Sequence, residues 1–123
     1  MLKLKTKWFH KWAKKNFVTD KILLKTIKDV EHNLGVSNLG YGLYKVRTSK
    51  IGQGKSGSFR TILVYKESDI VIFVYGFAKN EKDNLDNDEL KYFRKLAKDL
   101  LEIDRQNYSE LEKSGAFFSI SEV

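Results

Sequence analysis

Three basic side chains of this sequence, Lys45, Arg47 and Arg60, have the residue types and the spacing of an anion-binding site. Residues two apart in a β-strand project from the same face, so Lys45 and Arg47 should point the same way. Arg60 begins the next predicted strand, and pairing of the two strands would bring it beside them. Cations grouped in this way can grip a phosphodiester and stabilise the charge that develops as it reacts. The alternative is that all three are solvated side chains on the outer face of a sheet.

Acidic residues are missing from the two segments that are richest in Lys and Arg. Residues 45–66 hold six Lys and Arg residues and no Asp or Glu, and residues 1–15 hold six lysines and no acid. The net charge of the 123-residue chain is +7, although the segment from Asp86 onward leans acidic. This asymmetry indicates a polyanionic partner, most often nucleic acid.

The glycine-rich stretch KIGQGKSGSFRTILVY, residues 50–65, contains the letters G-K-S of a nucleotide-binding loop. That motif requires a further glycine five residues before Gly54, where this chain has Ser49. It also requires a following helix, but residues 59–65 alternate as a strand does. We therefore interpret the stretch as a flexible connection between two strands, which places Lys50 and Lys55 beside the sheet.

Composition excludes several classes of protein. The chain has no cysteine, which rules out disulfides and thiolate metal sites, and its two histidines, His10 and His32, are too few to favour a zinc site. No stretch approaches the ~20 apolar residues of a membrane span, and the basic N-terminus lacks the apolar run of a signal peptide. We expect a single cytoplasmic domain over residues 1–123 that needs no cofactor.

Two helices are predicted before the basic strands. Thr6 can cap a short helix over residues 7–15, and Thr19 can cap a second helix that ends near Gly35. Together they would form an α-hairpin, and a short strand over residues 2–5 can precede them.

The middle of the chain has the alternating pattern of β-structure. Residues 36–42 are predicted as a loop, and residues 48–58 as a polar, glycine-containing loop. Strands are predicted at residues 43–47, 59–65 and 70–77. The last of these is almost wholly apolar, which indicates a strand that is buried on both faces near the middle of a sheet.

The C-terminal third is predicted to be helical. Asp86 and Glu89 have the spacing of a capping box, and the apolar residues that follow form one stripe of a helix. From Tyr108 we expect a weaker helix and then a frayed or partner-ordered end, so the tail after about residue 105 would depend on a partner. The order α-α-β-β-β-α predicts an α+β fold, in which helices cover one face of a small, mostly antiparallel sheet.

Two segments of the chain resemble a known family. Residues 43–85, LYKVRTSKIGQGKSGSFRTILVYKESDIVIFVYGFAKNEKDNL, look like the core of the RelE/HigB superfamily of bacterial toxins. The shared features are the K-x-[KR] strand, the S-G-[YF]-R entry to the next strand (here SGSFR), the apolar strand after it and the basic [GA]-K-x-E stretch. Residues 6–15, TKWFHKWAKK, resemble the opening of the HigB-like branch.

The resemblance implies the toxin of a type II toxin–antitoxin system, an mRNA endonuclease that works in the decoding site of the ribosome and is blocked by a cognate antitoxin. By position, Lys45 and Arg47 correspond to the basic strand pair of the active site. Arg60 corresponds to the arginine after the S-G turn.

This chain departs from the family pattern at two positions. Asn80, flanked by Lys79 and Lys82, stands where several relatives have a second arginine. Asp86 stands where some have a catalytic tyrosine, and it could simply cap the helix. The nearest later tyrosine is Tyr92. These departures leave the general acid and base open.

RNA can be cut without a metal when its 2′-hydroxyl attacks the adjacent phosphate. The planar fork of arginine suits the charged transition state, so we assign that role to Arg60 with Arg47 as a second contact. Nearby cations would lower the pKa of Lys45 from about 10.4, so that it could serve as base or as proton donor. Lys79 or Lys82 is the remaining candidate for the acid or for a phosphate contact.

Further basic residues are expected to contact the backbone of ribosomal RNA. They lie on the predicted N-terminal helix and in the loop of residues 48–58: Lys7, Lys11, Lys14, Lys50 and Lys55. His10 lies in the same lysine-rich helix, and we interpret it as a surface or phosphate-contacting residue.

Two other functions remain open. The ParE branch of the same scaffold poisons gyrase without cleaving RNA, but it generally lacks the clustered cations found here. The chain could also be a plain RNA-binding or ribosome-associated module.

Overall fold

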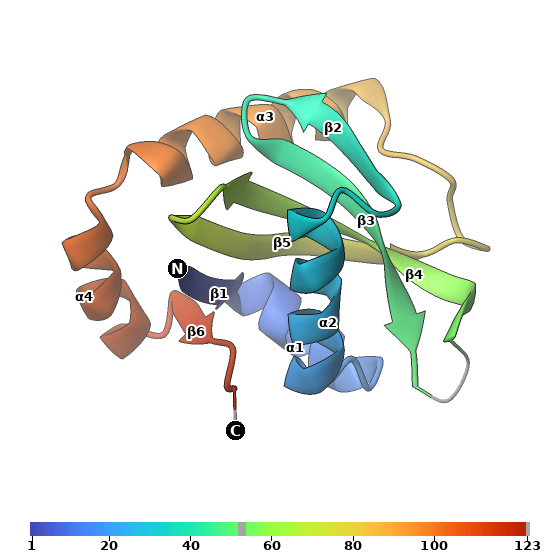
Figure 1. Cartoon of the computed structure of the whole chain (residues 1–123). Coiled ribbons are helices and arrows are strands. Elements are labelled where there is room, and N and C mark those ends of the chain that lie inside the picture. Colours follow the sequence, from blue (N-terminus) through green and yellow to red (C-terminus); the bar gives the residue numbers. More distant parts are fainter. Residues whose placement is uncertain (52–53, 123) are drawn as a thin grey trace.

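The computed structural model describes residues 1–51 and 54–122, and only the backbone of residues 54–57 (Figure 1). The elements in chain order are β1 (Leu2–Thr6), α1 (Lys7–Lys15), α2 (Asp20–Glu31), β2 (Val36–Gly40), β3 (Leu43–Lys50), β4 (Gly54–Lys66), β5 (Ile70–Ala78), α3 (Asn87–Glu102), the 3-10 helix η1 (Arg105–Asn107), α4 (Tyr108–Lys113) and β6 (Phe117–Ser119).

The strands form one sheet in the order β2-β3-β4-β5-β1-β6. All neighbouring strands are antiparallel except β1 and β5, which run parallel. The predicted α+β fold with a mostly antiparallel sheet is therefore confirmed. The predicted short first strand is also present, and its pairing with β5 places the apolar strand inside the sheet.

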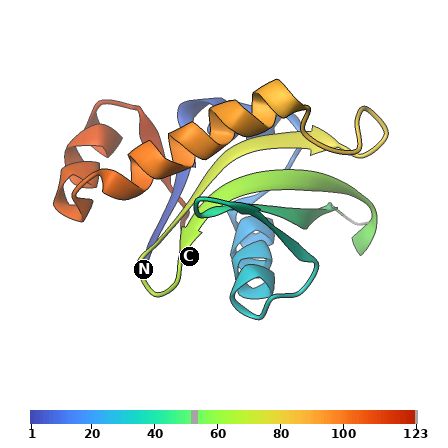
Figure 2. The same cartoon turned by 90° about the horizontal axis from the view of Figure 1, so that it is seen from above.

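Helices cover both faces of the sheet, so the expectation that they would cover one face is wrong. Ile72 and Val74 of β5 belong to the core beneath α3, whereas Val71 and Phe73 belong to the core beneath α1 and α2. Figure 2 shows α3 and α2 on opposite sides of the sheet. The physical reason is in β5 itself, because a strand that is apolar on both faces requires cover on both.

The N-terminal helices begin where their caps predict. The Thr6 hydroxyl accepts a hydrogen bond from the backbone N–H of Phe9, and Thr19 does the same for Ile22. The second helix ends at Glu31, before Gly35, since Asn33 already has a φ of 54° and turns the chain.

Among the described residues, no helix is both long enough and apolar enough to span a membrane.

Strand pairing extends into both predicted loops. Residues 36–40 form β2, which pairs with β3, and the β3–β4 ladder continues beyond Thr48 to Lys50, which pairs with Gly54. Polar and glycine-rich composition disfavours strands, but backbone pairing to an existing strand overrides it. The tip of the predicted loop, Gly52 and Gln53, lies outside the described residues.

The end of the chain, for which we expected a frayed or partner-ordered segment, packs on the sheet. β6 pairs with β1, and the N–H of Ile120 donates to the Lys3 carbonyl at 2.9 Å. Tyr108 of α4 is buried, and its hydroxyl donates to the Leu100 carbonyl at 2.6 Å. Burial raises the pKa of Tyr108 to about 12.

Gly76 in β5 allows α1 to pack closely against the sheet. A Cβ atom at this position would lie 2.6 Å from the ring of Trp12. We predict that Gly76→Ala lowers the free energy of unfolding by about 1–3 kcal/mol, measured by urea denaturation. In a Trp12→Leu background the same change should cost much less, and an equal cost there would show that the Trp12 ring is not responsible.

Candidate functional site

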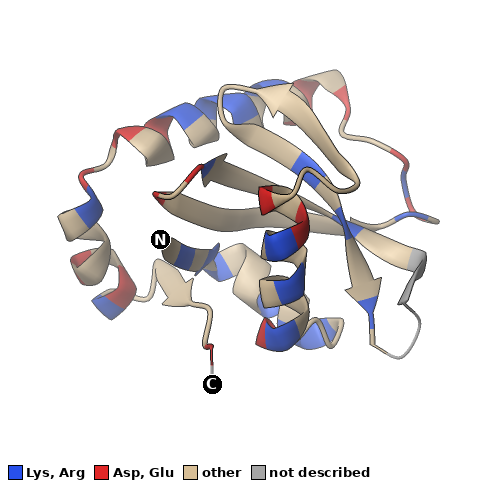
Figure 3. Cartoon of the chain, viewed as in Figure 1, with Lys and Arg blue, Asp and Glu red and all other residues tan. Residues whose placement is uncertain are grey.

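The three predicted cations lie on one face of the sheet. Arg47 of β3 and Arg60 of β4 are directly opposite each other in the ladder, and Lys45 is opposite Ile62. Ile62 belongs to the core beneath α3, so the cations project on the α3 side. Figure 3 shows Lys and Arg along β3 and no Asp or Glu on that strand. We name Lys45, Arg47 and Arg60 the cation patch.

Among the described residues, no ion pair neutralises the cation patch. Burial lowers the pKa of Arg60, and the charge of Arg47 lowers it further, although Asp83 acts in the opposite direction. Like charges placed opposite each other on two strands repel. An anion bound between them would relieve this repulsion.

Two polar side chains orient the patch without changing its charge. Arg60 Nη1 donates to Ser58 Oγ at 3.1 Å, and Lys45 Nζ donates to Asn84 Oδ1. Sequence reasoning missed both residues. Strand alternation could have indicated Ser58, because it precedes Arg60 by two positions on the same strand. Asn84 was not, because it comes from the polar loop before α3.

A cavity of about 410 Å³ opens at the cation patch. This volume falls in the range of roughly 300–1,000 Å³ that is typical of ligand sites. Its remaining walls come from Val46, from the turn that leads into β2 (Asn33 and Gly35) and from the start of β2 (Val36 and Ser37). A phosphate group of a larger ligand can therefore approach all three cations from one side.

Lys79 and Lys50 line a second cavity, of about 360 Å³, together with Ser58, Asn80 and Asp83. Because Ser58 also holds Arg60, this second cavity adjoins the cation patch. The structure thus brings the predicted Lys79 and Lys50 close to each other, in the cavity next to Arg60.

Lys82 lies near the patch but is already paired. Its Nζ lies 5.5 Å from the centroid of the Phe77 ring, and Phe77 is the β5 partner of Arg60. Lys82 forms an ion pair with Glu89, and this hydrogen bond raises the pKa of the lysine. Lys82 is therefore a weaker proton donor than a free lysine.

The lysines of the N-terminal helix that we predicted to contact RNA do not lie on the same face as the cation patch. Lys7, Lys11 and Lys14 are exposed on α1, which packs against the face of the sheet opposite α3. The predicted basic residues therefore divide between two faces of the molecule. The side chain of Lys55 lies outside the described residues.

His10 is not the exposed residue that we expected. Its ring stacks on Phe118 with 3.9 Å between the ring centroids, and its buried Nδ1 has no hydrogen-bond partner among the described residues. Burial lowers the pKa of His10, and the nearby charges of Lys5 and Lys14 lower it further. The reason for the difference is the C-terminal strand, which covers this side of α1.

Asp86 caps α3, which was one of the two interpretations of this residue; the other was that it takes the place of a catalytic tyrosine. Its side chain accepts from the N–H of Glu89, and the Glu89 side chain accepts from the N–H of Asp86. Tyr92 is 63% exposed on α3 and lines a groove with Trp8, away from the residues that line the patch cavity. The described residues contain no group of three His, Cys, Asp or Glu side chains placed to hold a metal ion.

The Lys82–Glu89 pair makes a testable contribution to stability. Glu89→Gln keeps the acceptor of the capping box and removes only the charge, so we predict a loss of about 0.5–1 kcal/mol at pH 7 by urea denaturation. Because Lys82 lowers the pKa of Glu89, this contribution is present above 4.5, the ordinary value, and disappears as the pH falls through the lowered pKa.

The matched control is Glu110→Gln, which removes the exposed partner of Lys113. It should change stability less than Glu89→Gln does at pH 7. A difference between wild type and Glu89→Gln that stays constant in acid would contradict an ionic origin.

Comparison with known proteins gives one result that agrees with the α+β fold and the cation patch. No curated protein matches the chain. A family model described as the RelE toxin of the RelE/RelB toxin–antitoxin system matches residues 1–120, which is nearly the whole chain. With this match, with the α+β sheet and with its cation patch, the chain belongs to the RelE toxin family.

Proposed function

We propose that this RelE-family toxin is a ribosome-dependent endonuclease that cleaves translated mRNA in the cytoplasm. The observation that carries the proposal is the cation patch, in which Arg47 and Arg60 lie opposite each other on two paired strands and form no ion pair with a described carboxylate. A scissile phosphodiester supplies the missing negative charge.

The proposed reaction needs no bound metal. The 2′-hydroxyl of one nucleotide attacks the adjacent phosphorus in line, the bond to the 5′-oxygen breaks, and the products are a 2′,3′-cyclic phosphate and a 5′-hydroxyl. Arg60, oriented by Ser58, holds the non-bridging oxygens as their charge grows, and Arg47 supplies a second contact. Lys45, held by Asn84, accepts the proton of the attacking hydroxyl or donates one to the leaving oxygen.

Two lysines compete for the remaining role in proton donation or phosphate binding. Lys82 is paired with Glu89, which raises its pKa and opposes donation. Lys79 is exposed and lines the cavity next to Arg60. We therefore assign the role of acid or outer phosphate contact to Lys79 and a supporting electrostatic role to Lys82.

The ribosome has a physical part in this proposal. The cation patch consists of one lysine and two arginines, which hold charge, so the orientation of the message must supply much of the rate. The exposed lysines of α1 lie on the other face of the sheet, where they can bind ribosomal RNA while the patch faces the message.

Membership of a toxin–antitoxin family implies an antitoxin partner. We propose that a segment of the antitoxin bearing Asp or Glu covers the cation patch. Its carboxylates would occupy the positions of the phosphate oxygens, and inhibition would follow from competition for the same guanidinium groups.

Primer extension on a translated message tests the proposal. Wild-type toxin should produce cuts within codons during translation, and Arg60→Ala should reduce cleavage roughly 100-fold or more, because a charge-stabilising contact is lost. Lys45→Ala should weaken cleavage. Lys25→Ala, which removes an exposed charge from α2, is the matched control and should cleave as wild type does.

Each alternative function has its own outcome in this experiment. Growth arrest with intact messages and altered DNA supercoiling would replace the nuclease by a gyrase inhibitor of the ParE type. Binding of RNA without growth arrest or cleavage would leave only a binding module.

A further inference from the structure

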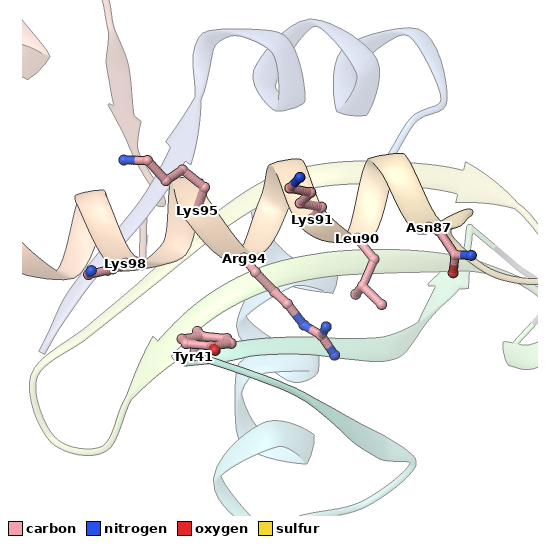
Figure 4. Close-up of a pocket in the computed structure, with 7 residues that line it drawn as sticks. All are labelled: Tyr41, Asn87, Leu90, Lys91, Arg94, Lys95 and Lys98. Atoms are coloured by element: carbon pink, nitrogen blue, oxygen red, sulfur yellow. The ribbon is translucent and has the colours of Figure 1, made fainter.

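A basic groove lies between α3 and the turn that joins β2 to β3. Its volume is about 520 Å³. Figure 4 shows Arg94 and Leu90 extending from α3 toward the hairpin that carries Tyr41. The residues that line it are Tyr41, Asn87, Leu90, Lys91, Arg94, Lys95 and Lys98. None of these residues belongs to the cation patch or to its cavity.

Tyr41, at the edge of this groove, has a backbone conformation that is unfavourable for a tyrosine. It is 70% exposed, and its φ of 60° lies in the left-handed region, between Gly40 at 92° and Gly42 at 83°. A bulky side chain in this region is strained, and here burial does not compensate for the strain. Strain at an exposed aromatic ring indicates a role in binding rather than in folding.

The cations of the groove are largely unmatched. Arg94 Nε donates to the Leu39 carbonyl at 2.7 Å, which orients the guanidinium group and leaves Nη1 and Nη2 without a hydrogen bond in the described part of the chain. Lys91 and Lys98 form no ion pair with any described residue. Of the groove cations, only Lys95 forms an ion pair within the described part of the chain, with Asp99 at 2.9 Å.

An exposed aromatic ring beside several cations matches the chemistry of single-stranded nucleic acid. An unpaired base can stack on the ring while the flanking phosphates contact Arg94 and the lysines. An acidic protein segment would also be attracted by the charges. A base gains more from the exposed ring, because it can stack its face on the ring while its phosphates remain beside the cations.

The groove begins where the cation patch ends. Asn84, which holds Lys45, lies in the loop three residues before Asn87, the first residue of α3, which lines the groove. From Asn87 to Lys98 the helix extends about 16 Å. A strand of RNA leaving the patch can therefore continue along α3 to Tyr41.

We propose that this groove is a second RNA subsite, in which a base next to the cleaved segment stacks on Tyr41 and its phosphates bind Arg94, Lys91 and Lys98. The inference rests on the proposed function in taking the translated message as the ligand. The subsite sets the register of the message, and it takes no part in the chemistry.

The test measures binding of a fluorescent ten-nucleotide RNA with 2′-O-methyl groups, which cannot undergo the proposed cleavage. Tyr41→Gly should weaken binding roughly tenfold through the lost stacking contact, and it should fold at least as stably as wild type because the strain is removed. Tyr41→Phe should bind as wild type does. The double variant Lys91→Ala/Lys98→Ala should reduce the slope of log affinity against log salt by about 0.7 for each lost phosphate contact.

Controls separate this subsite from general attraction to charge. Lys21→Ala/Lys25→Ala removes the same charge from α2 and should leave affinity and salt slope nearly unchanged. An RNA duplex of the same sequence should be insensitive to Tyr41→Gly, because its bases are already stacked.

Unchanged binding by Tyr41→Gly would overturn the proposal, and so would an equal loss in the α2 control. Groove variants that keep RNA affinity but no longer co-purify with the antitoxin would assign the groove to the protein partner instead. Because the probe is inert, failure of the nuclease proposal appears separately, as unchanged cleavage by Arg60→Ala on a translated message.

Discussion

The pairing of β3 with β4 is the constraint on which the rest of this molecule depends. It places Arg47 opposite Arg60 and aligns Lys45 on the same face. Repulsion among these cations opposes the pairing, so the energy that maintains it must come from the apolar residues of the same two strands. There, Leu43 and Ile62 pack beneath α3, and Val46 and Leu63 pack beneath α2. Burial of apolar side chains in the two cores thus offsets the repulsion among the three cations.

This arrangement explains why the site is built from strands. A strand fixes the direction of its side chains through the ladder, whereas a loop does not. Ser58 and Asn84 then restrict the ends of Arg60 and Lys45. Preorganised charge of this kind favours an ionic ligand, because little reorganisation remains to be done when the ligand binds.

The sequence predicts the parts of the structure that depend on local patterns. Thr6, Thr19 and Asp86 cap helices as expected, because a cap is a contact between residues only three positions apart. The shared face of Lys45 and Arg47 follows from strand alternation. The RelE family itself is confirmed, whereas the HigB-like branch, suggested by residues 6–15, stays a prediction.

Other features could not be predicted because they depend on distant partners. Residues 36–40 are polar, and they form a strand only because β3 is beside them. The ring of His10 is covered by Phe118, which lies more than a hundred positions away in the chain. Lys82 is paired with a glutamate of the next helix. The absence of nearby acidic residues in the sequence therefore does not show that a lysine is unpaired in the fold. Strand alternation is the better guide, because it gives the direction in which a lysine side chain points.

The last strand of the chain, β6, pairs along the outer side of the first, β1. During synthesis β1 emerges well before β6, so this border of the sheet can close only after the residues between the two strands have been made. Bringing together strands that are so far apart in sequence requires the closure of a long loop, which costs chain entropy and slows folding.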